Sequence, residues 1–255
     1  LGIPVAYVVG TSMGAIMGGM YSLGYSSVEL ESIISGLDWS LYIKDEIGTG
    51  QMSSEGRLDR SKFLIDIPFD VSGGKLNSSF RDAGYGSDNS STSLLTDLPS
   101  GFVGGYNLVN LFNSLSVGYG DSIYFDDLPI PFACVATDVT TGEAVVLRDG
   151  LFTSAIRASM AIPGVFSPVI IDDKLLMDGG MSNNFPVDLC KKMGANIVIG
   201  VDVGSHMTTN ISELQSLPQI LMQLLNLIVS ERTSENRLLC TVCIRPEVSD
   251  YNMLS

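Results

Sequence analysis

A glycine-flanked serine near the start of the sequence constrains the fold more than any other feature. Residues 10–14 read Gly-Thr-Ser-Met-Gly; they follow an apolar run over residues 5–9 and precede residues 15–20, which are mostly small and apolar. A strand that stops at a glycine, followed by serine and then by a helix, is the sequence form of a nucleophile elbow. The pattern therefore predicts a strand, a sharp turn at Ser12 and a helix.

The residue types around Ser12 follow from the geometry of such a turn. A serine on a strand-to-helix turn has strained backbone angles, so the positions two before and two after it must carry little side chain. Gly10 and Gly14 meet this requirement. The helix directs its amides toward the serine, and we expect the Met13 amide to stabilise a developing oxyanion. Ser12 is the candidate nucleophile.

A second candidate feature is Asp178, which follows a predicted strand over residues 174–177 and precedes Gly179 and Gly180. An aspartate followed by two glycines can turn sharply and project its carboxylate. The same tripeptide also suits an ordinary Asx turn. By itself it does not decide between a catalytic and a structural aspartate.

Apolar strands alternate with amphipathic helices along the rest of the chain. This alternation predicts an α/β fold in three layers, with a mostly parallel central sheet flanked by helices. We expect residues 1–255 to form a single domain. Helices are expected over residues 26–36, 107–115, 154–161, 186–192 and 217–228, strands over residues 63–69, 131–139, 144–147, 169–171, 174–177, 196–203 and 239–244, and a long loop over residues 82–99.

Composition limits the classes of partner. The chain has 255 residues, 45% of them hydrophobic, which is enough for one domain with a substantial core. Its formal charge of -14 argues against nucleic acid and against electrostatic docking on anionic membranes. Contact with lipid would therefore use apolar loops. Residues 217–229 are interrupted by polar side chains and are too short to span a bilayer, so no transmembrane helix is expected.

Neither a cofactor nor a metal is expected. The four cysteines, at positions 134, 190, 240 and 243, lie in apolar or amphipathic segments, which favours buried thiols over disulfides. Cys240 and Cys243 have CxxC spacing but no second pair and no histidine cluster to complete a zinc site.

The base that would serve Ser12 can be assigned in two ways. Histidine is the usual base for a serine nucleophile, and the one histidine of the sequence, His206, gives the chain order Ser12, Asp178, His206 of an α/β-hydrolase triad. However, His206 lies among polar residues, as a solvated surface histidine does. The alternative is that Asp178 itself accepts the proton, which requires a carboxylate that is close and partly desolvated.

Residues 10–14 and 178–180, with Arg157-Ala158-Ser159 and Ile162-Pro163 between them, resemble the bacterial patatin-like phospholipases. The similarity covers nearly the whole chain and includes residues 98–101, 133–138 and 183–187. The resemblance implies a Ser-Asp dyad without histidine, with Ser12 as nucleophile, Asp178 as base, and Gly179 and Gly180 forming the turn that supports the base.

The sequence departs from this family at its ends. Such proteins carry a glycine-rich oxyanion loop some tens of residues before the elbow, and this chain begins after that point. It also stops soon after its last strand, where the family usually adds a helix. We therefore expect a truncated domain, and whether it is active by itself stays open because an oxyanion donor is worth roughly 10²- to 10³-fold in rate.

The resemblance implies a lipid acyl hydrolase of the phospholipase A or esterase type that works through a serine acyl-enzyme. Two alternatives stay open: a Ser-Asp-His esterase, and a catalytically silent lipid-binding module of a larger membrane-associated protein. The expected partners are a phospholipid or another fatty acyl ester and a membrane surface; a homodimer is compatible with the sequence, and nucleic acid is not expected. The sequence does not decide the compartment: the chain is compatible with a peripheral cytoplasmic protein and with a secreted or outer-membrane-associated passenger domain.

Overall fold

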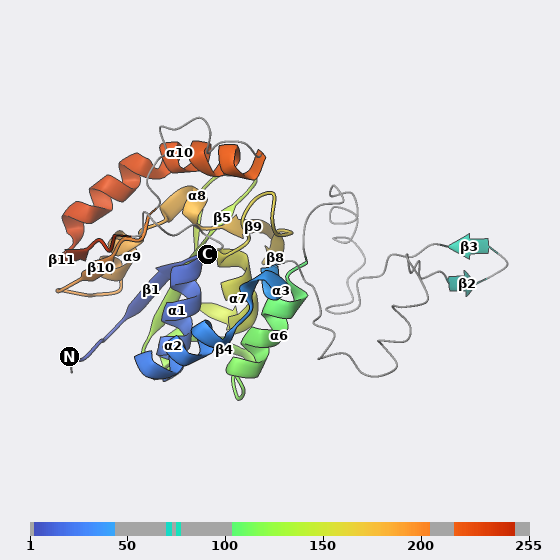
Figure 1. Cartoon of the computed structure of the whole chain (residues 1–255), viewed down its shortest axis with the longest axis horizontal. Helices are drawn as coiled ribbons and strands as arrows, with labels where there is room; N and C mark the ends of the chain where they lie inside the picture. The colour runs from blue at the N-terminus through green and yellow to red at the C-terminus, as the bar shows by residue number, and fades with distance from the viewer. Residues whose placement is uncertain (1–2, 44–69, 73–74, 78–103, 205–216, 248–255) are drawn as a thin grey trace.

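The computed structural model describes residues 3–43, 70–72, 75–77, 104–204 and 217–247 (Figure 1). The strand expected over residues 63–69, the loop expected over residues 82–99, and His206 lie outside these residues. The described chain forms a central sheet covered by helices on both faces.

The central sheet has five strands in the order β1-β5-β9-β8, with β6 paired to β5. All seven residues of β5 are buried: the apolar residues 132–136, as their sequence predicts, and also Thr137 and Asp138 at the end of the strand. The strands are β1 (Val8–Thr11), β5 (Phe132–Asp138), β6 (Ala144–Leu147), β8 (Val169–Ile171) and β9 (Lys174–Asp178).

Two of these strands meet end to end on β5. β6 pairs with residues 134–137 of β5 along one edge, so β1 and β9 both lie along the other edge. β1 runs parallel to β5 and ends with Thr11 opposite Val135; β9 runs antiparallel and ends with Asp178 opposite Ala136. The carboxyl ends of β1 and β9 therefore face each other at adjacent positions of β5.

The α/β class with helices on both faces is confirmed, but the sheet is mixed and not mostly parallel. Within the described residues, β1 with β5 is the one parallel pair of the five-stranded sheet. Short turns account for two of the antiparallel pairs, β5 with β6 and β8 with β9, because a tight hairpin forces its strands to be antiparallel. β8 and β9 are joined by Asp172 and Asp173, both at positive φ (49° and 59°), as a two-residue hairpin of this kind requires.

Alternate residues of β5 contribute to two cores. Phe132, Cys134 and Ala136 face a helical layer whose packing includes contacts among the rings of Phe125, Phe132 and Phe152. This layer consists of α1 (Met13–Ser22), α2 (Ser27–Gly36), α6 (Tyr106–Leu115) and α7 (Phe152–Ser159). These bounds confirm the four helices expected here, and α2 begins with the capping box of Ser26 and Glu29.

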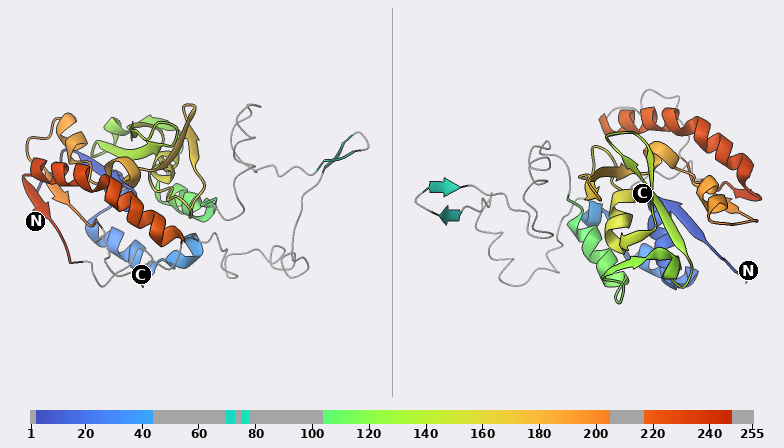
Figure 2. Two further views of the ribbon diagram at one scale, coloured as in Figure 1. Left: turned by 90° about the horizontal axis from the view of Figure 1, so that it is seen from above. Right: turned by 180° about the vertical axis from the view of Figure 1, so that it is seen from behind.

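The opposite face of the sheet is covered by three further helices. Ala133 and Val135 of β5 pack against Leu189 and Met193 on this side. The helices are α8 (Gly180–Asn183), α9 (Val187–Lys192) and α10 (Leu217–Leu239). Figure 2 shows the long α10 lying across α8 and α9, with which it makes its main contacts. No helix among the described residues is long and apolar enough to cross a membrane.

The strand expected over residues 196–203 is shorter and more exposed than its apolar sequence suggests. β10 covers Ile199–Val201 and pairs in parallel with β11 (Val242–Ile244) in a separate two-stranded sheet. Ile199 and Val201 are about half exposed, while Gly200 between them is buried. The smaller elements are α3 (Trp39–Ile43), β2 (Asp70–Ser72), β3 (Lys75–Asn77), β4 (Ser122–Tyr124), the 3-10 helix η1 (Phe125–Asp127) and β7 (Asp149–Leu151).

Candidate active site

Ser12 occupies a strained turn between β1 and α1. Its backbone angles are φ 54° and ψ -119°, a combination that non-glycine residues rarely adopt. The turn brings Gly10 against the first turn of the helix: a Cβ at Gly10 would lie 2.1 Å from the Gly14 carbonyl oxygen. A Cβ at Gly14 would meet no described atom within 4 Å. The steric demand inferred from the sequence is therefore found at Gly10, and Gly14 contributes through its backbone.

The side chains of Ser12 and Asp178 are in direct contact. The Ser12 hydroxyl donates a hydrogen bond to Asp178 Oδ2 at 2.7 Å, and the Gly180 amide donates to Oδ1 at 2.7 Å. Burial raises the pKa of Asp178 from 3.8 to about 6, against the lowering effect of these two hydrogen bonds. Asp178 as a whole is 6% exposed. It is thus desolvated and still ionised at neutral pH, as a base for Ser12 must be.

The two glycines after Asp178 are required by close contacts. A Cβ at Gly179 would lie 2.1 Å from the Val135 carbonyl oxygen, and one at Gly180 would lie 2.9 Å from Asp178 Oδ1. The Asp178 amide is held by the carbonyl of Ala161 at 3.0 Å. Only glycine lets the chain turn here while the Gly180 amide reaches the carboxylate.

Met13 is the first residue of α1 and is about half exposed. Amides in the first turn of a helix have no intrahelical acceptor. The Met13 amide follows Ser12 directly in the chain, at the N-terminus of this helix. The histidine of the alternative triad, His206, lies outside the described residues.

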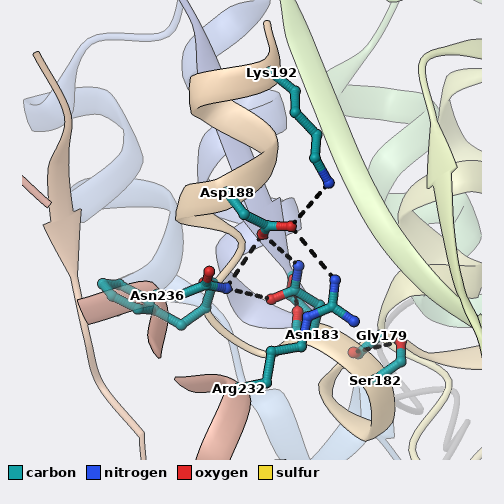
Figure 3. Close-up of polar contacts among 9 residues, drawn as sticks. Gly179, Ser182, Asn183, Asp188, Lys192, Arg232 and Asn236 are labelled. Atoms are coloured by element: carbon teal, nitrogen blue, oxygen red, sulfur yellow. Dashed lines mark hydrogen bonds and ion pairs between the residues drawn. The ribbon is translucent and has the colours of Figure 1, made fainter. Parts of the chain in front are cut away.

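A polar network lies between α8, α9 and α10 (Figure 3). Asn183 Nδ2 donates to Asp188 Oδ1 at 2.8 Å, and Asn236 of α10 donates to Asn183 Oδ1 at 3.0 Å and to Asp188 Oδ1 at 3.2 Å. Lys192 and Arg232 form ion pairs with Asp188 Oδ2. The network joins α8, α9 and α10 into one unit.

Two threonines connect this unit to the ends of the central strands. The Thr11 hydroxyl donates to the Asn183 carbonyl at 2.8 Å, and the Thr137 hydroxyl lies 2.8 Å from the Ser182 hydroxyl of α8. Thr137 also donates to the Asp178 carbonyl at 2.9 Å, within the central sheet. From the other helical layer, the hydroxyl of Ser159 at the end of α7 accepts the Ser12 amide at 3.0 Å. The sequence interpretation assigned no role to Thr11 or Thr137 and used Ser159 only for a resemblance.

The described residues contain no group of three or more His, Cys, Asp and Glu side chains placed to hold a metal ion. Cys134 is buried and Cys243 is exposed, so the expectation of buried thiols holds for the first and is wrong for the second. The site consists of a serine hydroxyl, a buried carboxylate and a helix N-terminus. These groups lie at a strand-to-helix turn of the nucleophile-elbow type, within an α/β fold.

Comparison with known families agrees with this architecture. The family described as Patatin-like phospholipase matches residues 1–191. The chain belongs to the patatin-like phospholipase family.

The relatives of the chain include much longer proteins. Patatin-like phospholipase domain-containing protein 7 of Mus musculus is 30% identical over 213 residues, which are 83% of this chain and 12% of the relative. Lysophospholipase NTE1 of Meyerozyma guilliermondii is 27% identical over 204 residues, 80% of this chain and 11% of the relative. Patatin-like phospholipase domain-containing protein 6 of Homo sapiens is 43% identical over 89 residues, 34% of this chain and 6% of the relative.

The matched part of the chain thus spans about an eighth or less of the length of these curated relatives. These relatives are eukaryotic proteins, so they give no support to the bacterial affiliation expected from the motifs.

Proposed function

We propose that this chain carries the catalytic residues of a lipid acyl hydrolase, which cleaves fatty acyl esters of phospholipids or lysophospholipids through a Ser12 acyl-enzyme. The observation that carries the proposal is the 2.7 Å hydrogen bond from the Ser12 hydroxyl to the buried Asp178 carboxylate. The substrate class is supported by membership of the patatin-like phospholipase family and by the lysophospholipase among the relatives.

In the proposed reaction, Asp178 acts as the base both when Ser12 is acylated and when water hydrolyses the acyl-enzyme. Asp178 takes the Ser12 proton while Oγ attacks the carbonyl carbon of the ester, and the Met13 amide donates to the oxyanion. The tetrahedral intermediate collapses, and the alcohol leaves with the proton held by Asp178. Asp178 then takes a proton from water, whose oxygen attacks the acyl-enzyme, and the fatty acid is released as Ser12 recovers its proton.

Turnover of a short-chain fatty acyl ester by the full-length protein tests the proposal. Ser12→Ala is expected to abolish turnover and covalent labelling by a fluorophosphonate, while His206→Ala is expected to leave both nearly unchanged. A wild-type protein that neither turns over the ester nor is labelled would support the silent lipid-binding alternative. A loss of about 10³-fold or more in His206→Ala would assign the base to the Ser-Asp-His triad.

A further inference from the structure

Ser159, the last residue of α7, makes hydrogen bonds both to Ser12 and to the turn that follows Asp178. It is fully buried. Its hydroxyl accepts the Ser12 amide at 3.0 Å and donates to the Val135 carbonyl at 2.6 Å, and its own carbonyl accepts the Gly179 amide at 3.2 Å. One residue is thus bonded to the nucleophile, to the central strand and to the turn after the base.

The position of Val135 explains why the hydrogen bond that it accepts from Ser159 is important for the site. Val135 pairs with Thr11 at the end of β1, and the next residue of β5 pairs with Asp178 at the end of β9. The Val135 carbonyl lies close to the place where the two strands meet, in contact with Gly179. The Ser159 hydroxyl supplies the donor for this carbonyl at the junction.

The direction of both hydrogen bonds is fixed by chemistry. A carbonyl oxygen can only accept and a backbone amide can only donate, so the single hydroxyl hydrogen of Ser159 points to Val135 and a lone pair faces the Ser12 amide. Ser12 is held at positive φ, and the bond to its amide opposes relaxation of that strained backbone.

We infer that Ser159 is a positioning residue for the reaction, which holds the Ser12 backbone so that its hydroxyl stays aligned on Asp178. This inference rests on the proposed function, because the alignment matters for turnover only if Ser12 is the nucleophile. Ser159 does not contact the reacting atoms, and its effect passes through the Ser12 amide and the Val135 carbonyl.

Ser159→Ala in the full-length protein tests the inference, with Ser116→Ala as the matched control. Ser116 is also buried and also donates its hydroxyl to a backbone carbonyl, that of Phe112 at 2.7 Å, but it lies at the end of α6 and has no contact with the dyad. For Ser159→Ala we expect kcat to fall by roughly 10- to 100-fold, as small misplacements of a reacting group do, with KM little changed. Ser116→Ala should keep the wild-type kcat.

The pH dependence of kcat/KM distinguishes a positioning role of Ser159 from a general loss of stability in the variant. The hydrogen bond from Ser12 lowers the pKa of Asp178. A loosened Ser12 gives up part of that effect, so the acid limb of kcat/KM should move to higher pH in Ser159→Ala and stay in place in Ser116→Ala. A merely structural role would lower the amount of folded enzyme without moving the limb.

Ser159→Cys is the second variant, because a thiol fills nearly the same space with a weaker donor and acceptor. We expect it to fold, with a kcat between those of the wild type and Ser159→Ala. Wild-type kcat and an unmoved acid limb in folded Ser159→Ala, or in folded Ser159→Cys if the alanine variant does not fold, would overturn the inference. A wild-type protein without turnover or Ser12 labelling would overturn the proposed function and the inference with it.

Discussion

Thr11 and Asp178 end two strands that approach each other along one edge of β5, at the adjacent residues Val135 and Ala136. Because Ser12 follows Thr11 directly, this register brings the serine hydroxyl to the Asp178 carboxylate. The contact joins residues 166 positions apart in the chain. The register of two strands on a buried third strand thus sets the geometry of the proposed dyad.

The activity should have an acid limb set by Asp178. A carboxyl group is a base only when ionised, and the pKa of Asp178 is raised to about 6 by burial. The ratio kcat/KM is expected to fall as the pH drops through about 6, measured with a neutral ester from about pH 4 to about pH 9. The same limb should be present in His206→Ala. Its loss in that variant would contradict the assignment to Asp178.

Asp178→Asn should abolish turnover and stabilise the fold at neutral pH. The pKa of this carboxyl is higher in the folded than in the unfolded protein, so the folded state binds the proton more tightly and stability is lost as the pH rises from about 4 to about 6. The loss amounts to about 3 kcal/mol at neutral pH, and a neutral asparagine avoids it. Urea unfolding should show the variant to be the more stable protein at neutral pH, by up to that amount.

The difference in the free energy of unfolding should disappear at low pH, where the wild-type carboxyl is protonated in both states. Equal stability of the two proteins at neutral pH would show that the buried carboxylate carries no desolvation penalty. Substantial turnover in Asp178→Asn would remove this residue from the role of base.

Gly10→Ala and Gly14→Ala should differ sharply although both glycines belong to the elbow. A methyl group at Gly10 would lie 2.1 Å from backbone oxygen and force the turn open, whereas at Gly14 it meets open space among the described residues. We expect Gly10→Ala to lose at least about 2 kcal/mol of stability. Gly14→Ala should gain about 0.5 to 1 kcal/mol, because alanine favours the helix.

Thermal unfolding of the two variants measures this contrast. An equal loss in both would mean that the second glycine is under a steric demand that the described residues do not show.

Asn236→Ala should destabilise the fold by about 2 to 3 kcal/mol, since the buried amide of Asn236 donates to Asn183, Asp188 and the Phe185 carbonyl. The control is Ser234→Ala on the same helix, whose exposed hydroxyl donates to a carbonyl one turn back. Urea unfolding of both variants gives the comparison. A difference below about 0.5 kcal/mol would show that the network in Figure 3 contributes little to holding α10.

Local patterns in the sequence predicted the elements near the site well. The helix expected over residues 107–115 is α6 (Tyr106–Leu115), and the strand expected over residues 174–177 is β9. Helical periodicity and apolar runs succeed here because each reports the environment of its own segment. The elbow at Ser12 was readable for the same reason, since its steric demands fall on neighbouring residues.

The mostly parallel character of the sheet and the length of β10 were not predicted correctly. A βα alternation suggests parallel strands, but the two aspartates at positive φ between β8 and β9 close a hairpin that the pattern does not reveal. The apolar residues 196–203 look like a buried strand, yet β10 pairs with β11 outside the central sheet and keeps Ile199 and Val201 about half exposed. Burial depends on which neighbours cover a segment, and a local pattern does not contain that information.

The sequence by itself determined that a serine would be held on a strand-to-helix turn, because sterics between adjacent residues leave that turn few alternatives. It named Asp178 only as one of two possible bases. Tertiary structure decided that the carboxylate touches Ser12, that it is desolvated, and that Ser159 bonds to the backbone on both sides of the contact. These properties arise between segments that are far apart in the chain, and they exist only once β5 has brought the ends of β1 and β9 together.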